Sequence, residues 1–130
     1  MSRFVADFMG ETNFLDGAIR SVHGASVVVE TPLGVFEGVA SSSLQPVPGG
    51  ACTLSIRPES WTLATSAAAS NGVAGRIRDR VYLGEMAQYE FVAASGALKI
   101  YELNPRFVDL SSDREVFASV APEDVVILPR

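Results

Sequence analysis

The sequence predicts an all-β fold, a barrel or sandwich built from short strands. Short runs rich in Val, Ile, Phe and Tyr recur roughly every eight to twelve residues, a spacing typical of such folds. Gly, Pro, Ser and Asn separate the runs, and these residues favour turns. Apolar residues hardly ever repeat at helical spacing, so we expect no long amphipathic helix.

Alternation of apolar and polar residues predicts strands at residues 4–9, 14–22, 26–30, 35–39, 52–57, 61–64, 75–82, 87–93, 98–103, 115–120 and 125–128. Several turns between them have a physical basis. His23-Gly24 and Ser95-Gly96 each supply a glycine for the positive φ that a tight hairpin requires. In T-P-L-G, Pro32 and Gly34 stand where a type I turn favours them. These turns predict antiparallel hairpins between neighbouring strands.

We expect a single domain made of two β subunits. Segment 65–72, T-S-A-A-A-S-N-G, is small and polar enough to be a flexible connection between residues of about 1–66 and 72–130. The two sides contain similar sequences, G-A-I-R-S-V at 17–22 and G-R-I-R-D-R-V at 75–81. Neither half has enough strands to bury its own core, so we infer a duplicated unit whose halves pack together.

Length and composition indicate a compact soluble protein. With 130 residues, the chain can bury about two-thirds of the surface that its unfolded form exposes. The 48% hydrophobic content excludes a disordered chain, and the apolar runs are too short to cross a bilayer. The first eight residues, M-S-R-F-V-A-D-F, have neither the apolar core nor the cleavage site of a signal peptide. We therefore expect a cytoplasmic protein.

The net charge of −5 disfavours binding to a polyanion unless a local basic stripe overrides it. Arg76, Arg78 and Arg80 come nearest to such a stripe, because alternate residues of a strand share one face. Carboxylates of neighbouring strands could balance them. We expect no nucleic-acid partner.

Motifs for catalysis, cofactors or metals are missing from the sequence. It contains no G-x-x-x-x-G-K-[ST] phosphate loop and no G-x-G-x-x-G, so we expect no ATP hydrolysis by this chain. Its single histidine and single cysteine, His23 and Cys52, are too few for a zinc site. We interpret His23 as exposed in a turn and Cys52 as a buried reduced thiol. No catalytic, cofactor-binding or metal-binding residue is predicted.

Two groups of carboxylates could in principle form acid/base or hard-cation sites. The first, Asp109, Asp113 and Glu115, lies in and around S-S-D-R-E, which has the composition of a solvated loop. The second, Glu123-Asp124, follows Pro122, where one helical turn would explain it. The solvated interpretation is preferred for both.

Arg57-Pro58-Glu59 ends a predicted strand in a proline, with a cation and an anion held close together. Two interpretations stay open. The pair could form a buried or interface ion pair, or it could brace a corner of the barrel.

Four blocks in order resemble one protein family: F-V-A-D-F-M-G-E-T-N-F-L at 4–15, L-S-I-R-P-E at 54–59, G-R-I-R-D-R-V-Y-L-G at 75–84 and P-E-D-V-V-I-L at 122–128. They are similar to the C-terminal transport-associated OB (TOBE) domain of ABC-importer ATPase subunits, of the polyamine (spermidine/putrescine) and related iron(III) types. The resemblance implies a duplicated OB-like β-barrel. It also implies that ATP and Mg²⁺ bind in a nucleotide-binding domain absent from this chain.

The resemblance further implies a regulatory domain that keeps two ATPase halves associated, as a cytoplasmic homodimer peripheral to the inner membrane. Its partners would be the nucleotide-binding domain of the same parent and, indirectly, the membrane permease subunits. The family pattern covers nine residues, which we expect to shape the fold and its interface: Gly10, Glu11, Asn13, Arg57, Pro58, Glu59, Tyr82, Leu83 and Gly84.

A second hypothesis is a domain that senses a small ligand, either an oxyanion or the transported solute. Backbone amides and Ser or Lys side chains could hold such a ligand between the two units, and Ser41, Ser42, Ser43 and Lys99 are candidates. For the transported substrate, iron(III) is the alternative to a polyamine.

Overall fold

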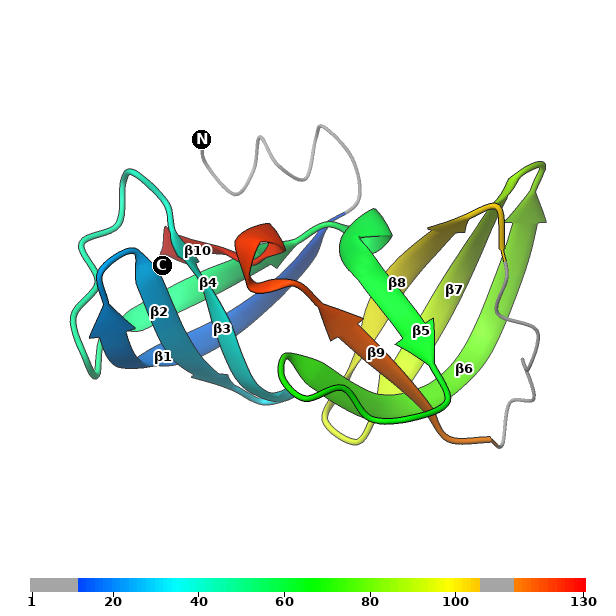
Figure 1. Cartoon of the computed structure of the whole chain (residues 1–130), viewed down its shortest axis with the longest axis horizontal. Helices are drawn as coiled ribbons and strands as arrows, with labels where there is room; N and C mark the ends of the chain where they lie inside the picture. The colour runs from blue at the N-terminus through cyan, green and yellow to red at the C-terminus, as the bar shows by residue number, and fades with distance from the viewer. Residues whose placement is uncertain (1–11, 106–113) are drawn as a thin grey trace.

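The computed structural model describes residues 12–105 and 114–130. The predicted strand at 4–9 and the predicted interface residues Gly10 and Glu11 lie outside the described residues, as do Asp109 and Asp113. The described chain consists almost entirely of strands, arranged in two units that lie side by side along the long axis of the molecule (Figure 1). The predicted all-β fold is confirmed.

The first unit is a closed five-stranded barrel with the strand order β1-β2-β3-β10-β4. Its strands are β1 (Asn13–His23), β2 (Ser26–Thr31), β3 (Gly34–Ala40), β4 (Ala51–Ile56) and β10 (Val126–Pro129). All neighbours are antiparallel except β3 and β10, which run parallel. Every strand of this barrel therefore has two neighbours.

The second unit is a five-stranded sheet with the order β5-β9-β6-β7-β8. Its strands are β5 (Trp61–Ala64), β6 (Gly72–Leu83), β7 (Met86–Ala93), β8 (Gly96–Leu103) and β9 (Val116–Val120). All its neighbours are antiparallel. The sheet is open, because β5 and β8 stand at its two ends.

Strand pairing crosses the predicted boundary between the subunits. β5 lies before the boundary in sequence but pairs with β9 of the second unit, whereas β10, which follows β9, closes the first unit. The expected division into 1–66 and 72–130 is therefore corrected: each half of the chain gives one strand to the other unit, β5 to the second and β10 to the first. A proline stands at both crossings: Pro58 and Pro122 each begin a short 3₁₀ turn, η1 (Pro58–Ser60) or η2 (Pro122–Asp124), after which the chain enters the other unit.

The duplication predicted from G-x-I-R is visible in the long strands β1 and β6. Each has a register shift at its arginine, between Ile19 and Ser21 in β1 and between Ile77 and Asp79 in β6. A β-bulge of this kind bends the strand. The bend lets each long strand pair with one neighbour along its first half and with another along its second half.

The two units share one hydrophobic core, which contains fully buried side chains from both. Phe36 of β3 and Trp61 of β5, both members of this core, meet edge to face with ring centroids 6.1 Å apart. Residues 65–70 of the predicted flexible connection are exposed, but the next residue, Asn71, is only 4% exposed. The connection thus ends at a fixed contact between the units and is not a free hinge.

Among the described residues, no helix has the length and apolarity needed to span a bilayer.

Candidate functional site

Two asparagines clamp the units together in the same way. Asn13, at the start of β1, accepts a hydrogen bond from the backbone N–H of Lys99 in β8 and donates one to its carbonyl, both at 2.8 Å. Asn71, just before β6, makes the same two bonds to Glu37 in β3, again at 2.8 Å. Each unit therefore supplies one asparagine that pairs with the backbone of the other.

Asn13 was a predicted fold and interface residue, and the structure places it at the junction of the units. Sequence reasoning missed Asn71. A signal was present, because both asparagines begin the pattern N-x-x-x-G-x-I-R, at residues 13–20 and 71–78. Asn71 also has a φ of +51°, a left-handed conformation that asparagine tolerates better than most residues.

A cavity of about 390 Å³ lies beside β4, β10 and the loop after β3. Most of the residues that line it are polar: Ser41, Ser42, Ser43, Ser55, Ser60, Thr12, Arg57, Glu123 and Asp124. The three predicted serines are thus brought together with Arg57. The arginine side chain is exposed, and the structure records no ion pair for it within the part of the chain that it describes.

The predicted motif Arg57-Pro58-Glu59 is divided between two places. Pro58 is buried and begins η1, whereas Glu59 lines a separate groove of about 200 Å³ between β5 and β8. No ion pair between Arg57 and Glu59 is recorded for the described residues. The interpretation in which the motif braces a corner is the one that its geometry fits.

Lys99 does not join the serines. Its side chain lines a different cavity, of about 440 Å³, between the start of β1 and the sheet of β6, β7 and β8. Asp79 and Glu90 line the same cavity. The structure therefore does not assemble the predicted set of Ser41, Ser42, Ser43 and Lys99 at one site.

Tyr82, Leu83 and Gly84 lie at the free end of the second sheet, where β6 turns into β7. Four large apolar side chains gather at this end and form a surface that we name the apolar tip: Val81, Tyr82, Leu83 and Leu103, which are 46%, 56%, 52% and 68% exposed. Leu83 pairs with Met86, which in turn pairs with Leu103, so Leu83 and Leu103 share one face, whereas Tyr82 pairs with Ala87 and lies on the other face of the sheet. Gly84 makes the turn with a φ of +66°.

The three arginines of β6 do not form one stripe. Arg78 is the extra residue at the bulge, and the register on either side pairs Arg76 with Val92 but Arg80 with Tyr89. Val92 and Tyr89 are an odd number of residues apart in β7, so they face opposite sides of the sheet. The expectation that the arginines share a face is corrected, because a bulge shifts the alternation by one residue.

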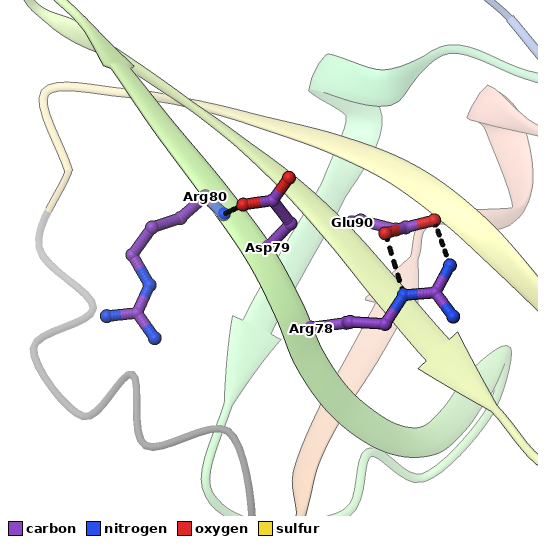
Figure 2. Close-up of polar contacts among 4 residues, drawn as sticks. All are labelled: Arg78, Asp79, Arg80 and Glu90. Carbon is purple, nitrogen blue, oxygen red and sulfur yellow. Dashed lines mark hydrogen bonds and ion pairs between the residues drawn. The ribbon is translucent and has the colours of Figure 1, made fainter.

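Arg78 is neutralised by a carboxylate across the strand pair (Figure 2). Its Nε donates to Oε1 of Glu90 at 2.8 Å, and its Nη2 donates to Oε2. This hydrogen-bonded ion pair raises the pKa of Arg78 and lowers the pKa of Glu90. Asp79 accepts a hydrogen bond from the backbone N–H of Arg80, whose guanidinium points away from the pair in Figure 2.

The pKa values of Cys52 and Tyr89 are also shifted. Burial raises the pKa of the Cys52 thiol, as expected for an inert core cysteine. Burial, together with a 2.9 Å hydrogen bond that Tyr89 donates to Glu102, raises the pKa of the Tyr89 hydroxyl. His23 is exposed in the turn between β1 and β2. No group of three or more His, Cys, Asp or Glu side chains that could hold a metal occurs in residues 12–105 and 114–130.

Known proteins similar to this chain include subunits of importers. It is 40% identical to the spermidine/putrescine import ATP-binding protein PotA of Rubrobacter xylanophilus, over 73% of this chain and 25% of that protein. It is 34% identical to the Fe(3+) ions import ATP-binding protein FbpC of Rhizobium etli, over 78% and 27% of the two chains. The chain spans about a quarter of the length of these curated relatives.

A solved structure shares the fold. The cytoplasmic molybdate-binding protein ModG, with molybdate bound, superposes with a TM-score of 0.80 over 91% of this chain and 96% of that chain, at 16% sequence identity. At this identity the likeness concerns the fold alone, and it confirms a duplicated OB-like architecture.

The family model for the TOBE domain matches residues 54–128. Together with the curated relatives, this match shows that the chain belongs to the TOBE domain family.

Proposed function

We propose that this chain is the regulatory and dimerisation domain of the ATP-binding subunit of an ABC importer for polyamines such as spermidine or putrescine. The observation that carries the proposal is that this TOBE domain aligns with curated import ATP-binding proteins, over about a quarter of the length of each. In this proposal, ATP and Mg²⁺ bind to a nucleotide-binding domain of the parent protein. The membrane permease subunits would hold the complex on the cytoplasmic side of the inner membrane.

The apolar tip supports a docking role. Soluble proteins seldom expose several large apolar side chains together unless the surface meets another protein. A stable interface buries roughly 1,200–2,000 Å² in total, so the tip would form the centre of an interface with a polar rim around it. We assign this surface to the contact between two copies of the domain.

Sedimentation equilibrium of the chain, from low micromolar to submillimolar concentration, tests this role. We expect a dimer that Leu83→Asn weakens about tenfold or more, the loss typical of a truncated central apolar contact. Val47→Asn is the matched control, because Val47 is a 61% exposed valine in a loop of the first unit. Monomers at every concentration, or equal effects of the two substitutions, would contradict dimerisation through the tip.

The transported substrate is tested in the full-length transporter. Uptake of spermidine that requires ATP and is absent for iron(III) would support the polyamine proposal. Iron(III) uptake is the alternative, since FbpC proteins are also among the relatives.

A second candidate function is the sensing of an oxyanion or of the transported solute in the cavity that holds Arg57. An exposed guanidinium surrounded by hydroxyl groups suits an oxyanion, whereas Glu123 and Asp124 at the same cavity suit a cationic solute. Calorimetry against molybdate, sulfate, spermidine and an iron chelate distinguishes them. Oxyanion binding lost in Arg57→Gln, or spermidine binding lost in Asp124→Asn, would support sensing, and no heat from any ligand would exclude it.

A further inference from the structure

The second sheet has an outer face, which is the side of β6, β7 and β8 opposite to the buried Tyr89 and Phe91. The three strands lie side by side at one end of the molecule (Figure 1). Their register aligns the outward side chains in three rows: Asp79 with Glu90 and Lys99, Val81 with Gln88 and Tyr101, and Leu83 with Met86 and Leu103. The outer face therefore changes from charged to apolar toward the end where β6 turns into β7.

The apolar end of the outer face is open to solvent. Leu83 and Leu103 are more than half exposed, and Val81 in the next row is nearly so. Tyr82 does not belong to this face, because it pairs with Ala87, which is buried on the inner side of the sheet. A hollow of about 210 Å³, lined by every residue of the first two rows, leaves space for side chains of another layer. Covering the exposed apolar side chains with such a layer would be favourable.

The charged row has an acidic end and a basic end. Asp79 stands on β6 and Lys99 on β8, and both are exposed. Between them on β7, the Glu90 carboxylate is neutralised by the guanidinium of Arg78 (Figure 2). Asp79 uses Oδ1 for the backbone N–H of Arg80, so its Oδ2 can accept from another donor. The Lys99 ammonium has three N–H donors, so it can bind a further carboxylate in addition to the contacts that Lys99 already makes.

We propose that two copies of the chain pack outer face against outer face, about a two-fold axis parallel to β7. This packing rests on the proposed dimerisation and gives it a geometry. A two-fold axis in this direction places β6 of one copy opposite β8 of the other and sets each row against itself. Asp79 of each copy then faces the partner's Lys99, and Leu83 faces the partner's Leu103.

The middle strand fits the same axis, because its outward residues meet their own copies. Gln88 can both donate to and accept from a second Gln88, and Met86 meets a second apolar Met86. The two Glu90 carboxylates also meet, and their repulsion is reduced by the guanidinium that each already binds. An axis across the strands would instead set the charged row against the leucines and take charges out of water without partners. Twisted sheets commonly pack face to face with their strands within about 30° of each other, as an axis parallel to β7 allows.

Exchanging the charges at the two ends of the row tests this packing, with sedimentation equilibrium as the measurement. Asp79→Lys and Lys99→Asp should each weaken the dimer about tenfold or more, because like charges then face each other twice. The double variant restores opposite charges across the axis and should return to within about threefold of the original affinity. Glu123→Lys is the matched control, because it makes the same change of charge at an exposed site next to the first unit and should leave the affinity unchanged. Urea denaturation followed by Trp61 emission shows which variants are folded.

The side of the sheet is tested by a second pair of variants. Leu83→Asn should weaken the dimer, whereas Tyr82→Asn should not, because Tyr82 lies on the inner side. Equal weakening by these two variants, equal effects of Asp79→Lys and its control, or no recovery in a folded double charge variant would overturn the packing. In each of these cases the original chain still forms a dimer, so the proposed dimerisation would stand. Monomers of the original chain at every concentration would overturn both.

Discussion

Replacing Asn71 by alanine removes one of the two clamps and tests how much the pairing of the units depends on it. The substitution deletes two hydrogen bonds of 2.8 Å to the backbone of Glu37, each worth about 1 kcal/mol of stability. Alanine must also adopt the φ of +51°, which costs about 1 kcal/mol more. We therefore expect Asn71→Ala to lower the free energy of unfolding by about 3 kcal/mol.

Two other asparagines separate these contributions. Asn104→Ala should lose only about 1 kcal/mol, because Asn104 is exposed and shares the left-handed φ, at +50°, without a clamp. Asn13→Ala should lower the free energy of unfolding by about 2 kcal/mol, because it breaks the two equivalent hydrogen bonds to Lys99. Asn13 lies in a strand, so alanine there adopts no left-handed φ. Urea denaturation followed by Trp61 fluorescence measures all three. If Asn71→Ala and Asn104→Ala lose the same free energy within about 0.5 kcal/mol, the clamp contributes no stability and the reasoning fails.

Three further predictions concern the core. Gly38→Ala should destabilise the protein by about 2 kcal/mol or more, because the new Cβ would lie 2.6 Å from a backbone carbonyl oxygen, whereas Gly96→Ala has room and should change it by less than about 0.5 kcal/mol in the same denaturation assay. The raised pKa of Tyr89 stabilises the folded state fully below the tyrosine value of the unfolded chain, about 10, and this contribution is lost as the pH rises above it. Above a pH of about 10, the free energy of unfolding of Tyr89→Phe should therefore fall less with pH than that of the original protein. Parallel curves of unfolding free energy against pH for the two proteins would contradict this. Cys52 should react with a thiol reagent only at the rate at which the protein opens, so fast modification of the folded protein would show that the thiol is not buried.

Local patterns predicted the strands well. From residue 12 onward, every expected strand has a counterpart within the described residues, because apolar alternation is a local property of the chain. Gly24 has the expected positive φ, but Gly96 does not, so the turn before β8 was assigned to the wrong residue. Partner choice is not local. Nothing in the alternation of β5 or β10 states that each pairs in the other unit, since that depends on where Pro58 and Pro122 send the chain.

The bulge at Arg78 and the clamp at Asn71 were missed for a related reason. A bulge changes the facing of every residue beyond it, but the strand pattern looks the same from sequence alone. Asn71 lies in a run that looks like a polar linker, T-S-A-A-A-S-N-G, and in the sequence only the pattern N-x-x-x-G-x-I-R, which it shares with Asn13, distinguishes it from its neighbours. Among the candidate site residues, the serines and Arg57 were brought together, whereas Lys99 and Glu59 were placed elsewhere.

The exchange of β5 and β10 has a consequence for synthesis on the ribosome. Four strands of the first barrel lie within residues 13–56, yet its fifth strand, β10, follows all the strands of the second unit in the sequence. β10 therefore leaves the exit tunnel after them, so β3 and β4 each lack the strand neighbour β10 while the second unit is synthesised. We expect the two units to acquire their structure together and late, with slow folding governed by contacts between distant parts of the sequence.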